Sequence, residues 1–128
     1  MNDMAALRQA VDQVLGGHLE PLLELLADDV EFEVAGSGTA WGKAAVADYF
    51  TALGALTAFW QIDYGAVDGQ VIAWGKESFR IQGCGLEGEC EFALVFDLTD
   101  RRIARLLVVE DLLAFMRAGG RLPSRVAA

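Results

Sequence analysis

The sequence is poor in metal-binding residues and in positive charge. It has one histidine and two cysteines, too few for the four-ligand sets that bind structural zinc. The carboxylates at 28–33 lack the spacing of a calcium loop. With 10 basic residues against 19 acidic ones, the net charge of −9 repels a phosphate backbone and an anionic membrane surface. We therefore expect no metal site, no nucleic-acid partner and no membrane partner.

Long apolar runs are also missing, since none approaches the roughly 18 residues of a spanning helix. The first residues, MNDMAALRQA, lack the basic region and apolar core of a signal peptide, so we expect a cytoplasmic protein. In that reducing compartment Cys84 and Cys90, on either side of the turn GLEGE, are expected as free thiols. A disulfide across the hairpin is the alternative.

Apolar residues are plentiful instead, at 54% of the chain, which is enough for a well-packed core. The length suits one domain, and no linker or internal repeat divides it. We expect a single domain over residues 1–120. The last residues, RLPSRVAA at 121–128, have the composition of a loose tail.

The first part of the chain has helical periodicity. Apolar residues at helical spacing over 4–15 predict a first helix that ends at Gly16-Gly17. A short second helix is expected next, with His18 at its cap and Pro21 in its first turn, where the missing N–H costs nothing. A structural role at the cap is favoured over a catalytic one for this histidine.

One strand lies between the second and third predicted helices. Residues 30–34 alternate, with apolar side chains on one face and Glu31 and Glu33 on the other. We expect a glycine-rich loop over 35–42 as the flexible rim of a cavity. The segment lacks the spacing of a phosphate-binding loop. The helix after it carries an apolar stripe at Val46, Tyr49, Phe50 and Leu53.

The second half of the chain predicts an antiparallel meander with tight turns. Asp68-Gly69 is a hairpin signal, and 83–88 and 99–102 are further turns. A last helix over 112–118, capped by Asp111, ends at a glycine pair. Such a pattern favours an α+β fold, a cone-shaped, curved sheet of mixed or antiparallel strands around three helices, with an apolar cavity. The four strands of the meander are expected at 59–67, 71–82, 89–98 and 103–110.

This order resembles a known family. The motif ADDVEFEV, the helix after Gly42 and the ending RRIARLLVVEDLLAFMRAGG resemble the SnoaL-like polyketide cyclases, in the superfamily of ketosteroid isomerase and nuclear transport factor 2. The resemblance covers nearly the whole chain. It implies a cone with a mostly apolar cavity, often dimeric, and no cofactor. It does not fix an activity, because isomerases, cyclases, hydrolases and non-catalytic binders share this fold.

The chain departs from the catalytic residues of these relatives. The resemblance places the aspartate base of ketosteroid isomerase at Val34, and its oxyanion-binding tyrosine and aspartate at Ala10 and Leu94. The working acid and histidine of the SnoaL-like cyclases fall near Leu106 and Phe92. All five residues are apolar, which argues against both mechanisms.

Two other carboxylates are candidates for acid or base chemistry. Glu77 is the one charge on the more apolar face of its strand, where desolvation would favour a base that works at neutral pH. The alternatives are a bulge that turns it to solvent or a cross-strand ion pair. Glu110 is the second candidate, at the mouth of the cavity, and Asp111 beside it has the sufficient role of a helix cap.

Apolar and aromatic residues are the candidates for the walls of the cavity. Trp41, Trp60 and Tyr64 offer flat surfaces and one hydroxyl donor for a ring-shaped ligand, although aromatic residues at strand spacing are more often ordinary core. The predicted substrate-binding residues are Trp41, Trp60, Tyr64, Phe79, Phe92, Leu94 and Leu106.

The outward-facing side chains predict a partner. Ile72, Trp74, Ala93, Val95, Leu107 and Val109 should form an apolar patch on the convex face of the sheet, which a homodimer would bury. Three functions remain open at this point. They are a cofactor-free enzyme that transfers protons on a small hydrophobic, cyclic or carbonyl-bearing molecule, a non-catalytic module that binds such a molecule, and a dimeric interaction domain whose cavity is filled by its own aromatic residues.

Overall fold

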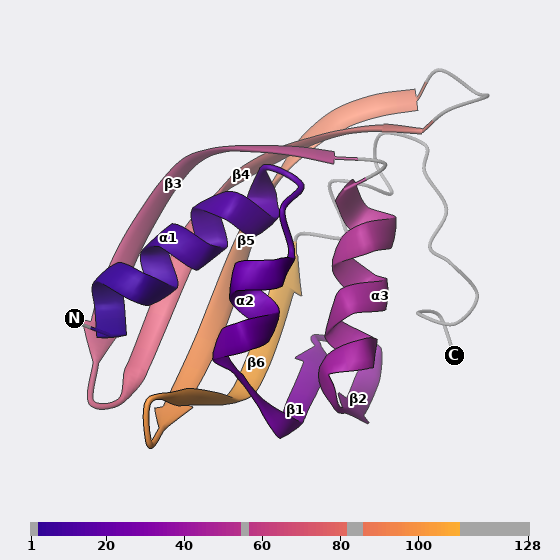
Figure 1. Ribbon diagram of the computed structural model, residues 1–128. Coiled ribbons are helices and arrows are strands. Elements are labelled where there is room, and N and C mark those ends of the chain that lie inside the picture. Colours follow the sequence, from indigo (N-terminus) through magenta and orange to yellow (C-terminus); the bar gives the residue numbers. More distant parts are fainter. Residues whose placement is uncertain (1–2, 55–56, 82–85, 111–128) are drawn as a thin grey trace.

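The protein is a curved sheet with three helices on one of its faces (Figure 1). The computed structural model describes residues 3–54, 57–81 and 86–110. The sheet has six strands in the order β2-β1-β6-β5-β4-β3, with β1 and β6 parallel and the other neighbours antiparallel. The elements are α1 (Asp3–Leu15), α2 (Glu20–Leu25), β1 (Leu26–Val34), β2 (Gly38–Trp41), α3 (Lys43–Gly54), β3 (Thr57–Val67), β4 (Gln70–Ile81), β5 (Leu86–Thr99) and β6 (Arg102–Glu110).

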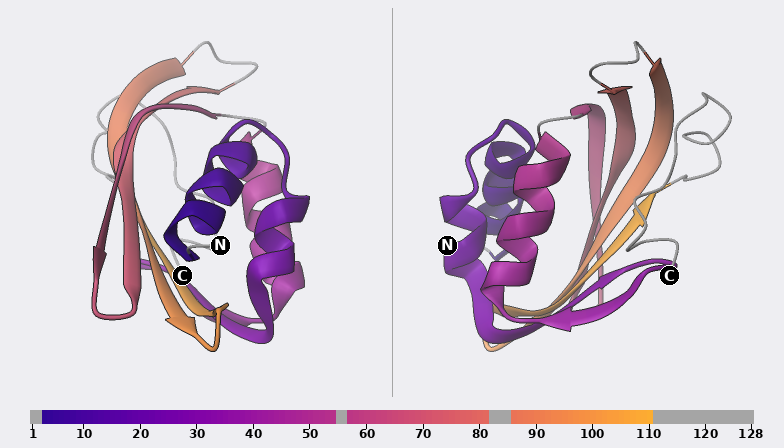
Figure 2. Two further views of the ribbon diagram at one scale, coloured as in Figure 1. Left: turned by 60° about the vertical axis from the view of Figure 1, so that its left-hand side comes forward. Right: turned by 90° about the vertical axis from the view of Figure 1, so that its right-hand side faces the viewer.

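The fold class predicted from the sequence is confirmed. Figure 2 shows the strands bending around the helices, so that the sheet has a concave face toward α1, α2 and α3 and a convex face turned away from them. The crossover from β1 to its parallel neighbour β6 runs through the rest of the chain. The sheet is mixed because of this one parallel pair.

The core fills the space between the helices and the concave face. Each fully buried aliphatic or aromatic side chain contributes roughly 1.5–3 kcal/mol, so this layer dominates the stability of the fold. The largest fully buried side chains are Phe96, Leu7, Leu22, Leu26, Ile103, Leu106, Val11, Val30, Val46 and Val108.

The ends of the first two helices are partly as predicted. α1 ends at Leu15, directly before the glycine pair, and Gly17 has a φ of 99° that favours glycine. Pro21 lies in the first turn of α2 as expected. The cap prediction for His18 was wrong, because Leu19 occupies the N-cap without a side-chain hydrogen bond. The backbone N–H of His18 instead donates to the Gln13 carbonyl at 2.7 Å, which closes the turn after α1.

The glycine-rich segment is a hairpin and not the loop that the sequence predicted. β2 pairs antiparallel with the end of β1, from Glu31 opposite Trp41 to Val34 opposite Gly38. Gly36 and Gly38 have φ values of 86° and 96°, which glycine adopts without strain and which allow the tight connection. The rim of the concave face is therefore a paired edge strand.

The meander follows the predicted order. The Asp68-Gly69 turn joins β3 to β4, and Asp100 and Arg101 take up positive φ values between β5 and β6. The register of β3 against β4 shifts between Trp60 and Asp63. The strand that the sequence predicted at 59–67 is therefore present but irregular at this point.

Several predictions fall on residues outside the description. These are the last helix, the tail at 121–128, Asp111 and the pairing of Cys84. The side chains of Trp60, Glu77 and Phe79 are likewise outside it, although their backbones belong to β3 and β4. In the described ranges no helix is long and apolar enough to cross a membrane.

Candidate functional site

Glu110 and Tyr49 meet at the end of the sheet. Glu110 is the last residue of β6, opposite Phe92 of β5, and Tyr49 lies on α3. The Tyr49 hydroxyl donates a hydrogen bond to Oε1 of Glu110, and both side chains are partly buried. A carboxylate and a phenol in contact form a base and a hydrogen-bond donor next to each other, which is a working combination for a carbonyl compound.

Aromatic packing holds the Tyr49 ring in place. Phe32 on β1 and Phe50 on α3 each make an edge contact with it, with ring centroids 5.3 Å apart. Both phenylalanines are buried, so the ring of Tyr49 has little freedom to turn. The apolar stripe of α3 thus does more than fill the core, because it aims one hydroxyl at the end of β6.

A small pocket lies between α3 and the β1–β2 hairpin. We call it the α3 pocket, and its volume is about 200 Å³. It is mostly apolar, with the Tyr49 ring on one side and the hairpin on the other. Its lining residues are Phe32, Val34, Ser37, Gly38, Thr39, Ala40 and Tyr49.

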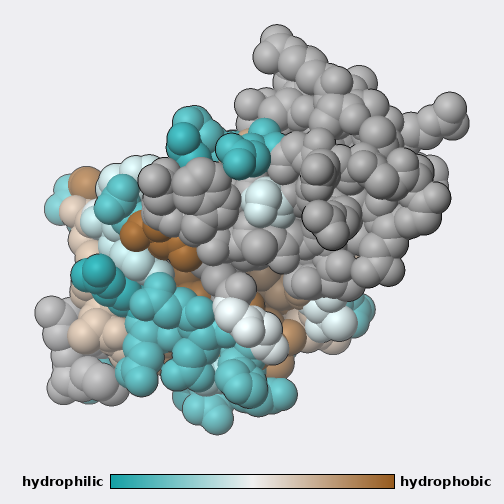
Figure 3. Space-filling view, turned by 90° about the horizontal axis from the view of Figure 1, so that it is seen from above, coloured by the Kyte–Doolittle hydropathy of each residue, from teal (hydrophilic) through white to brown (hydrophobic). Residues whose placement is uncertain are grey.

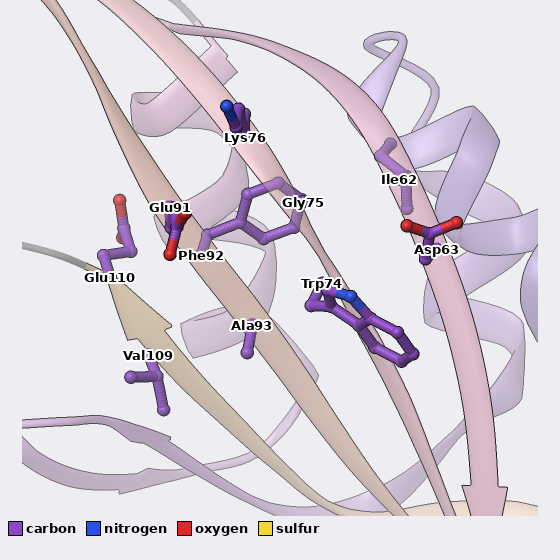
Figure 4. A pocket seen from close by; sticks show the side chains of 10 residues that line it. All are labelled: Ile62, Asp63, Trp74, Gly75, Lys76, Glu91, Phe92, Ala93, Val109 and Glu110. Atoms are coloured by element: carbon purple, nitrogen blue, oxygen red, sulfur yellow. The ribbon is translucent and has the colours of Figure 1, made fainter.

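A larger hollow lies on the convex side of the same strands. We call it the outer groove, and its volume is about 890 Å³. Figure 4 shows Val109, Ala93 and Trp74 in a row across three strands, with the helices behind the sheet. Trp74 and Val109 are 44% and 39% exposed, so the groove is open to solvent. The other lining residues are Ile62, Asp63, Gly75, Lys76, Glu91, Phe92 and Glu110.

Glu110 therefore belongs to both sides of the sheet. It accepts the hydrogen bond of Tyr49, which lines the α3 pocket, and it also lines the outer groove. Among the described residues, β6 runs to Glu110, and the pairing with β6 covers β5 from Phe92 onward, so Glu110 lies at the end of the described β5–β6 ladder. Seen from above, described apolar residues lie near the centre of the molecule between hydrophilic ones (Figure 3).

Three predicted wall residues are part of the interior. Phe92 is 4% exposed and lines the outer groove beside Glu110. Leu94 and Leu106 are buried in the core cluster, at 2% and 0% exposure, and line neither hollow. Their position follows from the register, in which Leu94 pairs with Val108 in the middle of the sheet.

Two other predicted wall residues point elsewhere. Trp41 is 65% exposed on β2 and pairs with Glu31, away from the apolar interior. The Tyr64 hydroxyl donates to Asp12 Oδ1 at 2.5 Å, and the Arg8 guanidinium carbon lies 4.9 Å from the ring centroid. Burial, followed by the hydrogen bond to Asp12, raises the pKa of the Tyr64 hydroxyl above its usual range. This tyrosine thus joins β3 to α1 and is not the free donor that the sequence suggested.

The side chain of Glu77, the first candidate base, is outside the described residues. Its backbone pairs with that of Cys90, whose side chain is buried, and with that of Phe59. Its role stays a prediction.

Sequence reasoning missed Tyr49 as a polar residue of the site. The helical spacing of apolar residues placed this tyrosine in an apolar stripe. A usable signal was that this stripe contained one hydroxyl, but its partner is 61 residues away in the chain.

The convex face also carries a cluster of charges around Arg105. Its guanidinium donates to Glu31 at 2.6 Å and to Glu33 at 2.7 Å, and lies 3.8 Å from Asp97. The hydrogen bonds to Glu31 and Glu33 raise the pKa of Arg105. In the part of the chain that the structure describes, no group of acidic, histidine or cysteine side chains is arranged to hold a metal ion.

Solved structures resemble this chain over most of its length. A candidate polyketide cyclase from Pseudomonas putida has a TM-score of 0.79 at 15% identity and covers 92% of this chain and 98% of its own. An NTF2-like protein from Burkholderia xenovorans has a TM-score of 0.75 at 19% identity, covering 91% and 94%. An LEH-like epoxide hydrolase from Mycobacterium tuberculosis has a TM-score of 0.70 at 18% identity, covering 91% and 87%. No family model and no curated protein matches the sequence. At these identities the likeness establishes a shared fold.

Proposed function

We propose that this chain, whose fold is that of the SnoaL-like and NTF2-like proteins, binds a small hydrophobic carbonyl compound and transfers a proton on it without a cofactor. The observation that carries the proposal is the hydrogen bond from Tyr49 to Glu110 beside an apolar pocket. Mostly apolar pockets with a few convergent polar groups are typical of small-molecule sites.

The chemistry follows from the two groups. A ketone that enters the α3 pocket takes the place of the Tyr49–Glu110 hydrogen bond. The Tyr49 hydroxyl then donates to the carbonyl oxygen, and the Glu110 carboxylate removes a proton from the adjacent carbon. The negative charge moves to the oxygen as an enolate, which the hydroxyl stabilises, and Glu110 returns a proton to carbon. Glu77 is the second candidate for the base, on the argument from the sequence alone.

The test is exchange of hydrogen for deuterium next to a carbonyl group. Cyclohexanone in heavy water is incubated with the protein, and the loss of its α-proton signal is followed by NMR. We expect the wild type to accelerate exchange, Glu110→Gln to lose about 10²-fold or more of the rate, and Tyr49→Phe to lose a similar factor. Glu24→Gln, an exposed carboxylate on α2, is the matched control. Equal rates for the wild type and Glu110→Gln would show that this carboxylate is not the base.

Binding without turnover is the second candidate function. It is favoured by the apolar residues Ala10, Val34 and Leu94 at the positions where the resemblance to ketosteroid isomerase places catalytic groups. In this case cyclohexanone binds, as seen by saturation-transfer NMR, and Val34→Phe blocks it by filling the pocket, but no protein variant changes the exchange rate.

We also propose that the protein is a homodimer through the convex face. Two neighbouring cross-strand rows form what we call the apolar band on this face, with the first row in the floor of the outer groove. Exposed apolar patches of this kind mark protein interfaces. The band consists of Trp74, Ala93 and Val109 in one row and Ile72, Val95 and Leu107 in the next.

A further inference from the structure

The indole of Trp74 lies over the backbone of the neighbouring strand β3. A Cβ atom at Gly65 would be 3.3 and 3.4 Å from Cζ3 and Cη2 of this indole, closer than the roughly 3.5–4.0 Å of an optimal carbon–carbon contact. The glycine therefore lets the ring approach the sheet, and a larger residue there would push it away. Trp74 is nevertheless 44% exposed, so its indole is held against the sheet and still presents surface to solvent.

Exposed carboxylates border this indole. Asp63 pairs with Trp74 across β3 and β4, directly after the register shift in β3. Glu91 lies on β5 in the next cross-strand row, opposite Lys76. Both carboxylates line the outer groove, and Figure 4 shows that of Asp63 beside the indole. None of the ion pairs between described residues involves Asp63, so its charge is available to a ligand.

The outer groove thus offers an aromatic surface, an apolar floor and an excess of negative charge. Ala93 and Val109 continue the floor in the row of Trp74. The described side chains that line the groove include three carboxylates and one ammonium group. The face of an indole attracts cations more strongly than other aromatic side chains do, and proteins bind quaternary ammonium ligands in this way. An organic cation with an apolar body therefore fits all three properties, whereas an anion is repelled.

We propose that the outer groove binds a small organic cation, in which a tertiary or quaternary ammonium group is attached to an apolar body. The ammonium group lies over the Trp74 indole beside Asp63, and the apolar body covers Ala93 and Val109. The groove volume of about 890 Å³ is within the range of small-molecule sites. The groove lies on the opposite face of the sheet from the α3 pocket, so this inference goes beyond the proposed function and does not depend on it.

The cation would compete with the proposed dimer. A second copy on the apolar band and a cation on Trp74 exclude each other, because both need the same row of side chains. A ligand that binds only the single chain shifts a monomer–dimer equilibrium toward the monomer. Cation binding should therefore weaken as the protein concentration rises.

The experiment uses benzyltrimethylammonium as the cation, benzyl alcohol as a neutral control and phenylacetate as an anionic control. Each compound is titrated into dilute protein, and its dissociation constant is measured by saturation-transfer NMR. The shift of the Trp74 indole N–H signal, assigned by its loss in Trp74→Leu, reports where the cation binds.

Three substitutions each change one part of the site. Trp74→Leu removes the aromatic face but keeps an apolar side chain, and Asp63→Asn removes the charge beside it. Gly65→Val pushes the indole away from β3 without changing any charge. Trp41→Leu is the matched control, because Trp41 is also exposed and also pairs with a glutamate but does not line the groove.

We expect the wild type to bind benzyltrimethylammonium about tenfold more tightly than benzyl alcohol and not to bind phenylacetate. Trp74→Leu should weaken binding of the cation about tenfold, and Asp63→Asn and Gly65→Val should each weaken it roughly threefold. Concentrated salt should weaken the binding to the wild type, because it screens the carboxylates. Trp41→Leu should bind like the wild type.

Two results with the wild type alone overturn the inference, whether or not a variant folds. One is no binding of the cation at any protein concentration, and the other is equal affinity for the cation and benzyl alcohol. A folded Trp74→Leu that binds the cation as tightly as the wild type overturns it as well.

Val34→Phe separates this site from the proposed reaction. This substitution fills the α3 pocket and should leave cation binding unchanged, while Trp74→Leu should leave cyclohexanone exchange unchanged. If cyclohexanone is not exchanged but the cation still shifts the Trp74 signal, the reaction is wrong and the cation site stands. Loss of cation binding in Val34→Phe would place the cation in the α3 pocket and overturn the inference.

Discussion

Tyr64→Phe tests whether the Tyr64 hydroxyl stabilises the fold or contacts the ligand. The substitution keeps the ring, and with it the contact to Arg8, but removes the hydroxyl that donates to Asp12 at 2.5 Å. A hydrogen bond to a charged acceptor contributes about 1.5–3 kcal/mol, and partial exposure of this pair reduces that to about 1 kcal/mol. For a domain of this length the loss corresponds to a melting temperature lower by roughly 3–5 °C. Cyclohexanone exchange should not change.

The stabilisation by the Tyr64 hydroxyl should decrease at high pH. The pKa of Tyr64 is raised in the folded state, so the hydroxyl contributes its full stability below the unfolded value of about 10 and loses it as the pH rises through the folded value. The difference in urea midpoint between the wild type and Tyr64→Phe should therefore be constant near about pH 8 and shrink by about pH 11. A difference that is zero at neutral pH, or a loss of exchange in Tyr64→Phe, would refute this reasoning.

Two further predictions concern the pocket and the charge cluster. The α3 pocket holds about 200 Å³, the volume of roughly seven waters, so single-ring ketones should bind and steroid-sized ones should not. Val34→Ala should let larger ketones bind, and Val34→Phe should abolish binding. If neither substitution changes which ketones bind, the ligand lies outside the α3 pocket. Arg105→Met leaves three carboxylates without their shared cation and should cost about 1 kcal/mol at low salt. In urea unfolding, this loss of unfolding free energy should be smaller in concentrated salt, because salt screens the repulsion between the carboxylates. An equal loss at low and high salt would exclude charge repulsion as its cause.

Local signals in the sequence were sufficient for most of the fold. Glycine at the end of α1, Pro21 in α2 and the Asp68-Gly69 turn each impose a backbone geometry within a few residues, and the structure has all three. Apolar alternation likewise identified the strands that face the helices. These features depend on covalent geometry and burial, which a sequence pattern records directly.

The hairpin after β1 could not be predicted in the same way. Gly38–Trp41 is a short edge strand whose pairing is decided by β1 and not by its own composition. Trp41 illustrates the difficulty, because a tryptophan in a glycine-rich segment suggests a buried wall, whereas edge pairing with Glu31 leaves it exposed. The irregularity in β3 has the same origin in strand pairing.

The polar contacts of the candidate site were beyond the reach of local patterns. Glu110 was identified as a candidate because it ends a strand at the mouth of the cone, but Tyr49 was not, since its contact spans 61 residues of sequence. Tyr64 was predicted to donate a hydrogen bond to the ligand, because its actual partner Asp12 is 52 residues away in the sequence and no local pattern indicates the contact. Pairings between α-helices and distant strands become visible only when the chain is folded.

The position of bound cyclohexanone tests the proposed roles of Tyr49 and Glu110 most directly. Intermolecular NOEs are measured between the protons of the ketone and the aromatic protons of the protein. We expect contacts with the rings of Tyr49 and Phe32, which line the α3 pocket, and their loss in Val34→Phe. Contacts with the indole of Trp74 alone, unchanged in Val34→Phe, would place the ligand in the outer groove and contradict the claim that Tyr49 and Glu110 act on it from within the cone.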